Sequence, residues 1–181
     1  HTRLAEETDD PEHFATINDA VARMDSLLEN MLTLARQGEA VDDSEEVCLD
    51  AVADKAWSFV ETDEATLSTR TELRIEADSE ALQQILENLF RNAIDHVGKD
   101  VTVVVGALPT GGFYVEDDGP CIPEADRDRV FSAGYSSGEG GSGLGLHIVA
   151  ELVEAHGWTI SVTDGPGGGC RFEISGVQTV Q

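Results

Sequence analysis

A glycine-rich stretch, GEGGSGLGLHIV at residues 138–149, carries residue types that can hold a phosphate group. Gly141, Gly143 and Gly145 leave backbone amides bare, and an apolar pattern typical of a helix begins directly after them. Because the N-terminal end of a helix carries a partial positive charge, such a loop suits an anion. No Lys follows the glycines and no strand leads into them, so the P-loop and dinucleotide-binding patterns do not fit. A flexible loop is the plain alternative to a phosphate site.

A polar stripe runs along the predicted helix SEALQQILENLFRNAIDHV at residues 79–97. Gln84, Asn88, Asn92 and Asp95 recur there at helical spacing. Beside them lies an apolar stripe, formed by Leu82, Ile85, Leu86, Leu89 and Ala93. Asn is a poor residue for a helix interior unless its amide is used, and amide oxygens suit Mg²⁺, which bridges to phosphates. The stripe therefore predicts a place for Mg²⁺.

A third segment, VEDDGPCIPE at residues 115–124, ends a predicted strand in carboxylates before Gly119 and Pro120 turn the chain. Taken alone, it is as well explained as an ordinary acidic turn.

In this order, the three segments resemble the histidine kinase, gyrase and Hsp90-type ATPase superfamily, and within it the sensor histidine kinases. ENLFRNAIDH is similar to the family's N box, DDGPCIP to its G1 box, RVFSAGYSS to its F box and GGSGLGLHIV to its G2 box. Residues 1–37 resemble the second half of the dimerisation and phosphotransfer domain, so the resemblance covers nearly the whole chain. It implies ATP and Mg²⁺ as cofactors.

The resemblance also implies roles for single residues. Asn88 and Asn92 take the catalytic N-box places, with Asn92 as the metal ligand. Asp117 would accept a hydrogen bond from the adenine amino group, and Gly119 would let the base approach. Residues 132–142 would form a mobile lid over the phosphates. The other implied nucleotide contacts are Cys121, Ile122, Phe131, Gly141, Gly143, Leu144, Gly145 and Leu146.

Several positions depart from the family pattern. Cys121 stands at the place of the second G1 glycine, so a side chain occupies room that the family leaves near the base. Asp95 and His96 stand where many members have Lys and Tyr, which removes a positive charge from the phosphate side. Possible substitutes for that charge are Lys99, Arg127 and Arg129. Cys170 falls where Thr or Ala is common, and we expect no consequence from it.

The family carries its phosphoacceptor histidine on the first helix of the hairpin, followed directly by Glu or Asp. Residues 1–37 hold no such pair, because His1 precedes Thr2 and His13 precedes Phe14. We therefore expect the acceptor upstream of this chain, and no autophosphorylation by the chain alone. His147 and His156 follow the glycine-rich loop and are predicted to be surface or packing residues.

Residues 1–37 show a helical heptad seam, because apolar positions from Phe14 to Ala35 alternate in spacings of three and four. A truncated helical hairpin that pairs with a second hairpin is predicted, and a single helix packed on its own domain is the alternative. GEAVDDSEE at residues 38–46 is predicted to be a hinge or linker. We place the domain boundary between residues 1–40 and 41–181.

Mixed helix and strand patterns follow the linker. Helices are predicted at 49–59, 79–97, 124–131 and 143–156, and strands at 65–71, 73–77, 101–108, 112–118, 158–164 and 170–175. The predicted fold class is α+β, a two-layer α/β sandwich with a mixed sheet and helices on one face, preceded by the truncated hairpin.

The chain is strongly acidic, with 36 Asp and Glu against 11 Lys and Arg and a net charge of -25. A polyanion would be repelled, which excludes nucleic acid as a partner. Such a surface suits concentrated salt and predicts a halophilic, haloarchaeal source, with an ordinary acidic cytosolic protein as the alternative. The three cysteines lack CxxC spacing, so neither a zinc site nor a disulfide framework is predicted. Without an apolar run long enough to span a bilayer, we expect a cytoplasmic location, with a parent protein that could be membrane-attached.

The resemblance implies the ATP-binding catalytic part of an ATP-dependent protein histidine kinase. It would transfer the γ-phosphoryl group of Mg-ATP to a histidine, for relay to an aspartate of a response regulator receiver domain. A homodimer through the hairpin and an upstream sensor domain are the implied partners. A gyrase-type or Hsp90-type ATPase is an alternative, but its catalytic Glu would stand at Asn88, and Glu87 points about 100° away around the helix. A non-catalytic nucleotide-binding or dimerisation module is the other alternative.

Overall fold

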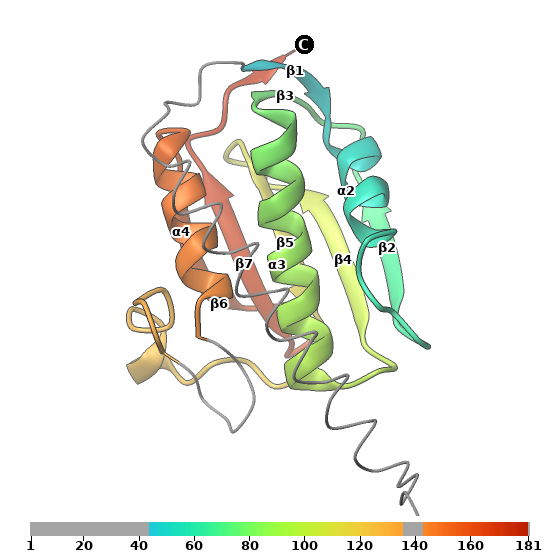
Figure 1. Ribbon diagram of the computed structural model, residues 1–181, viewed down its shortest axis with the longest axis vertical. Helices are drawn as coiled ribbons and strands as arrows, with labels where there is room; N and C mark the ends of the chain where they lie inside the picture. The colour runs from blue at the N-terminus through green and yellow to red at the C-terminus, as the bar shows by residue number, and fades with distance from the viewer. Residues whose placement is uncertain (1–43, 136–142, 181) are drawn as a thin grey trace, which may run out of the picture. The chain divides into compact units, whose positions relative to one another are not determined.

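The computed structural model describes residues 44–135 and 143–180, and the chain divides into two units, residues 1–36 and 37–181. The predicted helical hairpin and most of the predicted linker lie outside the described residues. Within the second unit, helices cover one face of a five-stranded sheet (Figure 1). This arrangement confirms the predicted two-layer α/β sandwich.

The large sheet has the strand order β2-β4-β5-β7-β6. Its strands are β2 (Thr66–Arg70), β4 (Thr102–Ala107), β5 (Phe113–Asp117), β6 (Thr159–Asp164) and β7 (Cys170–Ser175). β2 and β4 are parallel and the other neighbours are antiparallel, so the sheet is mixed, as predicted. The predicted strands at 101–108, 112–118, 158–164 and 170–175 form the two hairpins β4-β5 and β6-β7.

A second, small sheet has the order β1-β3-β8. Its strands are β1 (Glu45–Cys48), β3 (Arg74–Ala77) and β8 (Thr179–Val180). The linker predicted at 38–46 is wrong at its last two residues. Glu45 and Glu46 belong to β1, where they pair with Ala77 and Glu76 of β3. The two neighbouring strands predicted at 65–71 and 73–77 therefore belong to different sheets.

Three α-helices are described: α2 (Leu49–Trp57), α3 (Ser79–Val97) and α4 (Gly145–Ala155). α3 begins after Asp78, whose Oδ1 accepts hydrogen bonds from the backbone amides of Glu80 and Ala81, both at 2.9 Å. It ends at Gly98, which has a φ of 129°. Both ends agree with the prediction.

The helix predicted at 124–131 is wrong. Only a single 3₁₀ turn, η1 (Glu124–Asp126), forms there. Between residues 124 and 131 only Val130 is buried, so there is no apolar stripe to hold a longer helix against the core.

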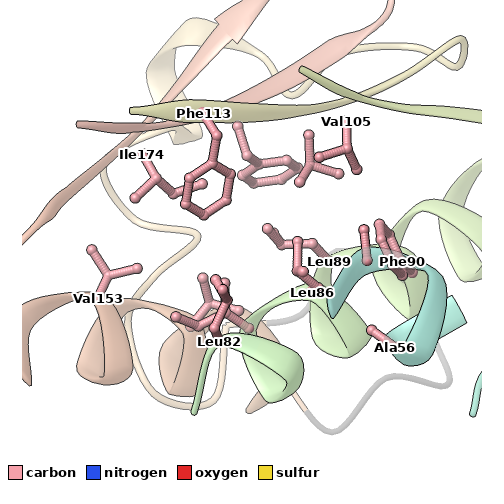
Figure 2. Close-up of a cluster of buried hydrophobic side chains, with 14 of the residues drawn as sticks. Ala56, Leu82, Leu86, Leu89, Phe90, Val105, Phe113, Val153 and Ile174 are labelled. Atoms are coloured by element: carbon pink, nitrogen blue, oxygen red, sulfur yellow. The ribbon is translucent and has the colours of Figure 1, made fainter. Parts of the chain in front are cut away.

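The core lies between the helices and the large sheet. Figure 2 shows Leu82, Leu86 and Leu89 of α3 facing Phe113, Val105 and Ile174 of the sheet. Every residue of the predicted apolar stripe of α3 is buried, and each large side chain contributes roughly 1.5–3 kcal/mol by leaving water. Among the described residues, no helix has the length and apolar character needed to cross a membrane.

Candidate nucleotide-binding site

α3 packs against α4 (Figure 1). Asn88 is a residue of α3 that lies beside Gly145, the first residue of α4. Its side chain is 6% exposed, and its Nδ2 donates a hydrogen bond to the backbone oxygen of Gln84 at 2.9 Å. Its Oδ1 faces Gly145, where an added Cβ would come within 3.3 Å of that oxygen. Asn92 stands one helical turn further along α3 and is half-buried. The predicted polar stripe therefore runs past the beginning of α4.

The N-terminal end of α4 carries neither a side-chain cap at Leu144 nor an acidic residue in its first turn. In a chain with a net charge of -25, a first turn without carboxylates leaves the positive end of this helix uncompensated by its own side chains. That local charge suits an anion such as a phosphate.

Gly143 holds the approach to α4 in a conformation that favours glycine. Its φ is 66°, and an added Cβ would come within 2.6 Å of the backbone oxygen of Tyr135. Its own carbonyl accepts a hydrogen bond from the amide of Gly134 at 3.2 Å. Gly141 and the rest of residues 136–142, which include most of the predicted lid, lie outside the described residues.

Asp117 ends β5 and is 6% exposed. Its Oδ1 accepts hydrogen bonds from the amides of Gly119 at 2.9 Å and of Cys170 at 3.4 Å. Within the described part of the chain, Oδ2 has no hydrogen-bond partner, so it is available to a donor such as an amino group. Burial raises the pKa of this carboxyl, an effect opposed by the two amide hydrogen bonds.

Gly119 stands two residues after Asp117 and packs against the last turn of α3. A Cβ at this position would overlap the side chain of Val97. Asp118, which lies between Asp117 and Gly119, accepts a hydrogen bond from the amide of Thr102 at 3.0 Å. The turn after β5 is thus fixed against both α3 and β4.

Residues 77–178 match the family model described as "Histidine kinase-, DNA gyrase B-, and HSP90-like ATPase". The chain belongs to this ATPase family. The sensor histidine kinase ZraS from Klebsiella oxytoca is 34% identical over 103 residues, which are 55% of this chain and 22% of ZraS. The chain therefore spans less than a quarter of that relative's length.

Solved structures agree with the family. The mycobacterial sensor histidine kinase MprB is 26% identical with a TM-score of 0.65, over 76% of this chain and 97% of that one. Full-length ShkA in complex with AMPPNP is 26% identical with a TM-score of 0.68, over 99% of this chain and 41% of that one. The described part of the chain is a sensor histidine kinase type of ATP-binding domain.

In this ATPase domain, Phe131, Leu144, Leu146 and Ile122 are half-buried and pack against the core. The Phe131 ring meets Phe172 edge to face at 6.5 Å between centroids. These four predicted nucleotide contacts thus border the core next to the turn after β5 and the start of α4.

The two histidines after the glycine-rich loop have packing contacts. His147 Nδ1 lies 3.1 Å from the backbone oxygen of Phe131. His156 Nε2 accepts a hydrogen bond from the amide of Asp78 at 3.2 Å, and its ring stacks on Trp158 at 4.2 Å between centroids. These contacts agree with the packing role predicted for both.

The candidate substitutes for the missing positive charge all contact carboxylates. Lys99 pairs with Asp63 at 2.6 Å and Arg127 with Asp164 at 2.7 Å. Arg129 lies 3.6 Å from Asp126. Asp95 and His96, which replace the usual residues, are exposed at the end of α3.

One contact at the site had no sequence signal. Cys121 Sγ lies 2.9 Å from Cys170 Sγ, although the two residues are 49 positions apart. Only the pairing of β5 with β7 brings the turn that contains Cys121 beside the first residue of β7.

Proposed function

We propose that this ATPase domain binds Mg-ATP and transfers its γ-phosphoryl group to a histidine on a dimerisation hairpin. The observation that carries this proposal is the position of the Asn stripe beside the start of α4. Amide oxygens for a metal then lie beside the N-terminal end of α4, whose first turn has no acidic residue and whose positive end suits a phosphate.

The metal fits this set of donors. Within residues 44–135 and 143–180, no three His, Cys, Asp or Glu side chains form a cluster that could hold a metal. Mg²⁺ commonly takes only one or two protein oxygens and completes its shell with water and substrate phosphates. We assign Asn92 as the protein ligand, with Asn88 supporting it between α3 and α4. Bound Mg²⁺ would neutralise phosphate charge, and the adenine would be held by Asp117 beside Gly119, Cys121 and Ile122.

The position of Glu87 favours a kinase over a hydrolase of the gyrase type. Gln83 Nε2 donates a hydrogen bond to Glu87 Oε1 at 2.6 Å, one turn earlier on α3. Asn88, not a carboxylate, faces Gly145. Phosphoryl transfer to a positioned acceptor depends mainly on orientation and charge neutralisation, which this arrangement can supply.

The rest of the proposal concerns the parent protein. Residues 1–40 would dimerise as a hairpin, a sensor domain would act on them, and a response regulator would receive the phosphoryl group on an aspartate. We propose a cytoplasmic location for the domain on the same grounds.

The test is to titrate the 181-residue chain with ATP and Mg²⁺, and then to add a separate hairpin that carries a His-Glu or His-Asp pair. We expect ATP binding, and γ-phosphate on the hairpin in an acid-labile form, as a phosphoramidate is. Binding without transfer would favour a non-catalytic module, and phosphate release without an acceptor would favour a gyrase-type ATPase. Absence of ATP binding would refute the proposal.

A further inference from the structure

The contact between Cys121 and Cys170 joins two segments at the candidate adenine site. Cys121 lies in the turn after β5, Cys170 begins β7, and both are free thiols. Their sulfur atoms lie 2.9 Å apart, whereas a disulfide bond measures about 2.05 Å. A movement of less than about 1 Å would therefore bring the sulfurs to bonding distance.

The two thiols differ in access and in charge environment. Cys121 is half-buried, and Arg127 Nη2 lies 3.7 Å from its sulfur, where the negative charge of an attacking thiolate would form. Cys170 is buried, and burial together with its contact to Cys121 raises its pKa to about 12. Cys121 is therefore the sulfur that meets an oxidant first, and Cys170 is the resolving thiol.

We propose that Cys121 and Cys170 form a redox-active dithiol whose disulfide weakens nucleotide binding. The thiolate of Cys121 attacks one sulfur of a small disulfide oxidant and releases the first thiolate. The sulfur of Cys170 then attacks Cys121, forms the internal disulfide and releases the second. Both protons pass to the released thiolates, and two electrons reduce the oxidant to two thiols.

The effect on nucleotide follows from what surrounds the pair, and it rests on the proposed function. Gly119, two residues before Cys121, packs so closely on Val97 that the turn has no space to move toward α3. The amide of Cys170 donates to Asp117 Oδ1. Closing the disulfide draws the turn away from Val97 toward β7, and it displaces both amides that fix the adenine carboxylate.

The experiment uses the full chain with Cys48→Ser, which leaves only the two thiols of interest. After exposure to oxidised glutathione, we expect both thiols to be lost without a glutathione adduct, with a mass decrease of two hydrogens. The affinity for ATP should fall on the order of tenfold, the size of one charge-assisted hydrogen bond, and Tm should rise by several degrees. Dithiothreitol should reverse all three changes.

Two controls separate the outcomes. Cys121→Ser in the Cys48→Ser chain should keep the same ATP affinity with and without oxidant, because the attacking thiol is gone. Cys170→Ser in the same chain should stop at a glutathione adduct on Cys121, because the resolving thiol is gone. Thiols that persist in the parent chain, or that stop at mixed disulfides, would overturn the proposal, as would a closed disulfide with unchanged affinity. If the reduced chain fails to bind ATP, the proposed function fails instead, and the thiol count still decides whether the pair closes.

Discussion

The side-chain oxygen of Asn88 faces Gly145 across the contact between α3 and α4, close enough that an added Cβ would stand 3.3 Å away. The Asn88 amide therefore lies beside the first residue of α4, at the contact between the two helices. Because Gly145 has no side chain, the Asn88 amide has room beside the first residue of α4.

Gly145→Ala should disturb this contact. Because the Asn88 side chain is buried and must give way, we expect ATP affinity to fall on the order of tenfold, as when one polar contact to a charged group is lost. The fold should survive, since Ala is favourable in a helix. Gly167→Ala is the matched control, because a Cβ there meets nothing within 4 Å. Equal ATP affinity of the two variants, measured by calorimetry, would contradict the assignment.

Asn92→Ala should remove a ligand of Mg²⁺. We expect weaker binding of ATP in the presence of Mg²⁺, and no difference from the parent chain when EDTA removes the metal. Asn92→Asp, which keeps an oxygen at the same place, is the control. A variant that loses as much affinity in EDTA as in Mg²⁺ would show that Asn92 acts on the nucleotide or the fold rather than on the metal.

Asp117→Asn should affect binding and stability in opposite directions. Burial in the folded domain raises the pKa of Asp117. The protonated carboxyl therefore contributes stability to the folded state at low pH, and this contribution is lost as pH rises through the raised pKa. At neutral pH the domain holds a buried charge, and the variant should melt at a higher temperature without nucleotide. The difference should shrink in acid. Thermal melts at several pH values without nucleotide test this sign.

The same carboxylate should set base selectivity. An amide can turn a donor toward the adenine amino group, so Asp117→Asn should lose more affinity for ATP than for GTP. In the parent chain, ATP affinity should decline as pH falls through the raised pKa of Asp117, because the protonated group accepts less well. Equal losses for both nucleotides would refute the adenine contact.

Gly119→Ala should strain the turn against α3. The new methyl group overlaps Val97, and overpacking of this kind costs about 1–3 kcal/mol. Adding Val97→Ala should recover part of the loss, so the double variant should unfold at a higher denaturant concentration than the two single effects predict by addition. Strict additivity in urea melts would mean that the two residues do not meet.

Salt should stabilise the domain. With 36 acidic and 11 basic residues, like-charge repulsion outweighs exposed ion pairs such as Lys99–Asp63, so screening favours the folded state. We expect Tm to rise with KCl at neutral pH and to change less in acid, where carboxylates are protonated. A Tm independent of KCl would contradict this, and a halophilic source stays a prediction.

Long elements with clear ends were predictable from the sequence. α3 has an apolar stripe, an Asp78 cap and a terminal Gly98, and it formed as expected. β8 has two residues and β1 has four, which are too few to show an alternating sequence pattern. Both strands form because they pair with β3. The contact between Cys121 and Cys170 was equally invisible, because it arises only from strand order.

The strand registers also indicate when the Asp117 carboxylate acquires its two hydrogen bonds during folding. β4 with β5, and β6 with β7, are hairpins that close over short stretches of chain, whereas Glu116 pairs with Arg171 of β7 only after a long loop has closed. Closing long loops costs more chain entropy and is slower. A chain with both hairpins formed but not yet joined would hold Asp117 without the Cys170 amide, so the proposed adenine contact would be completed last, as a product of the finished sheet.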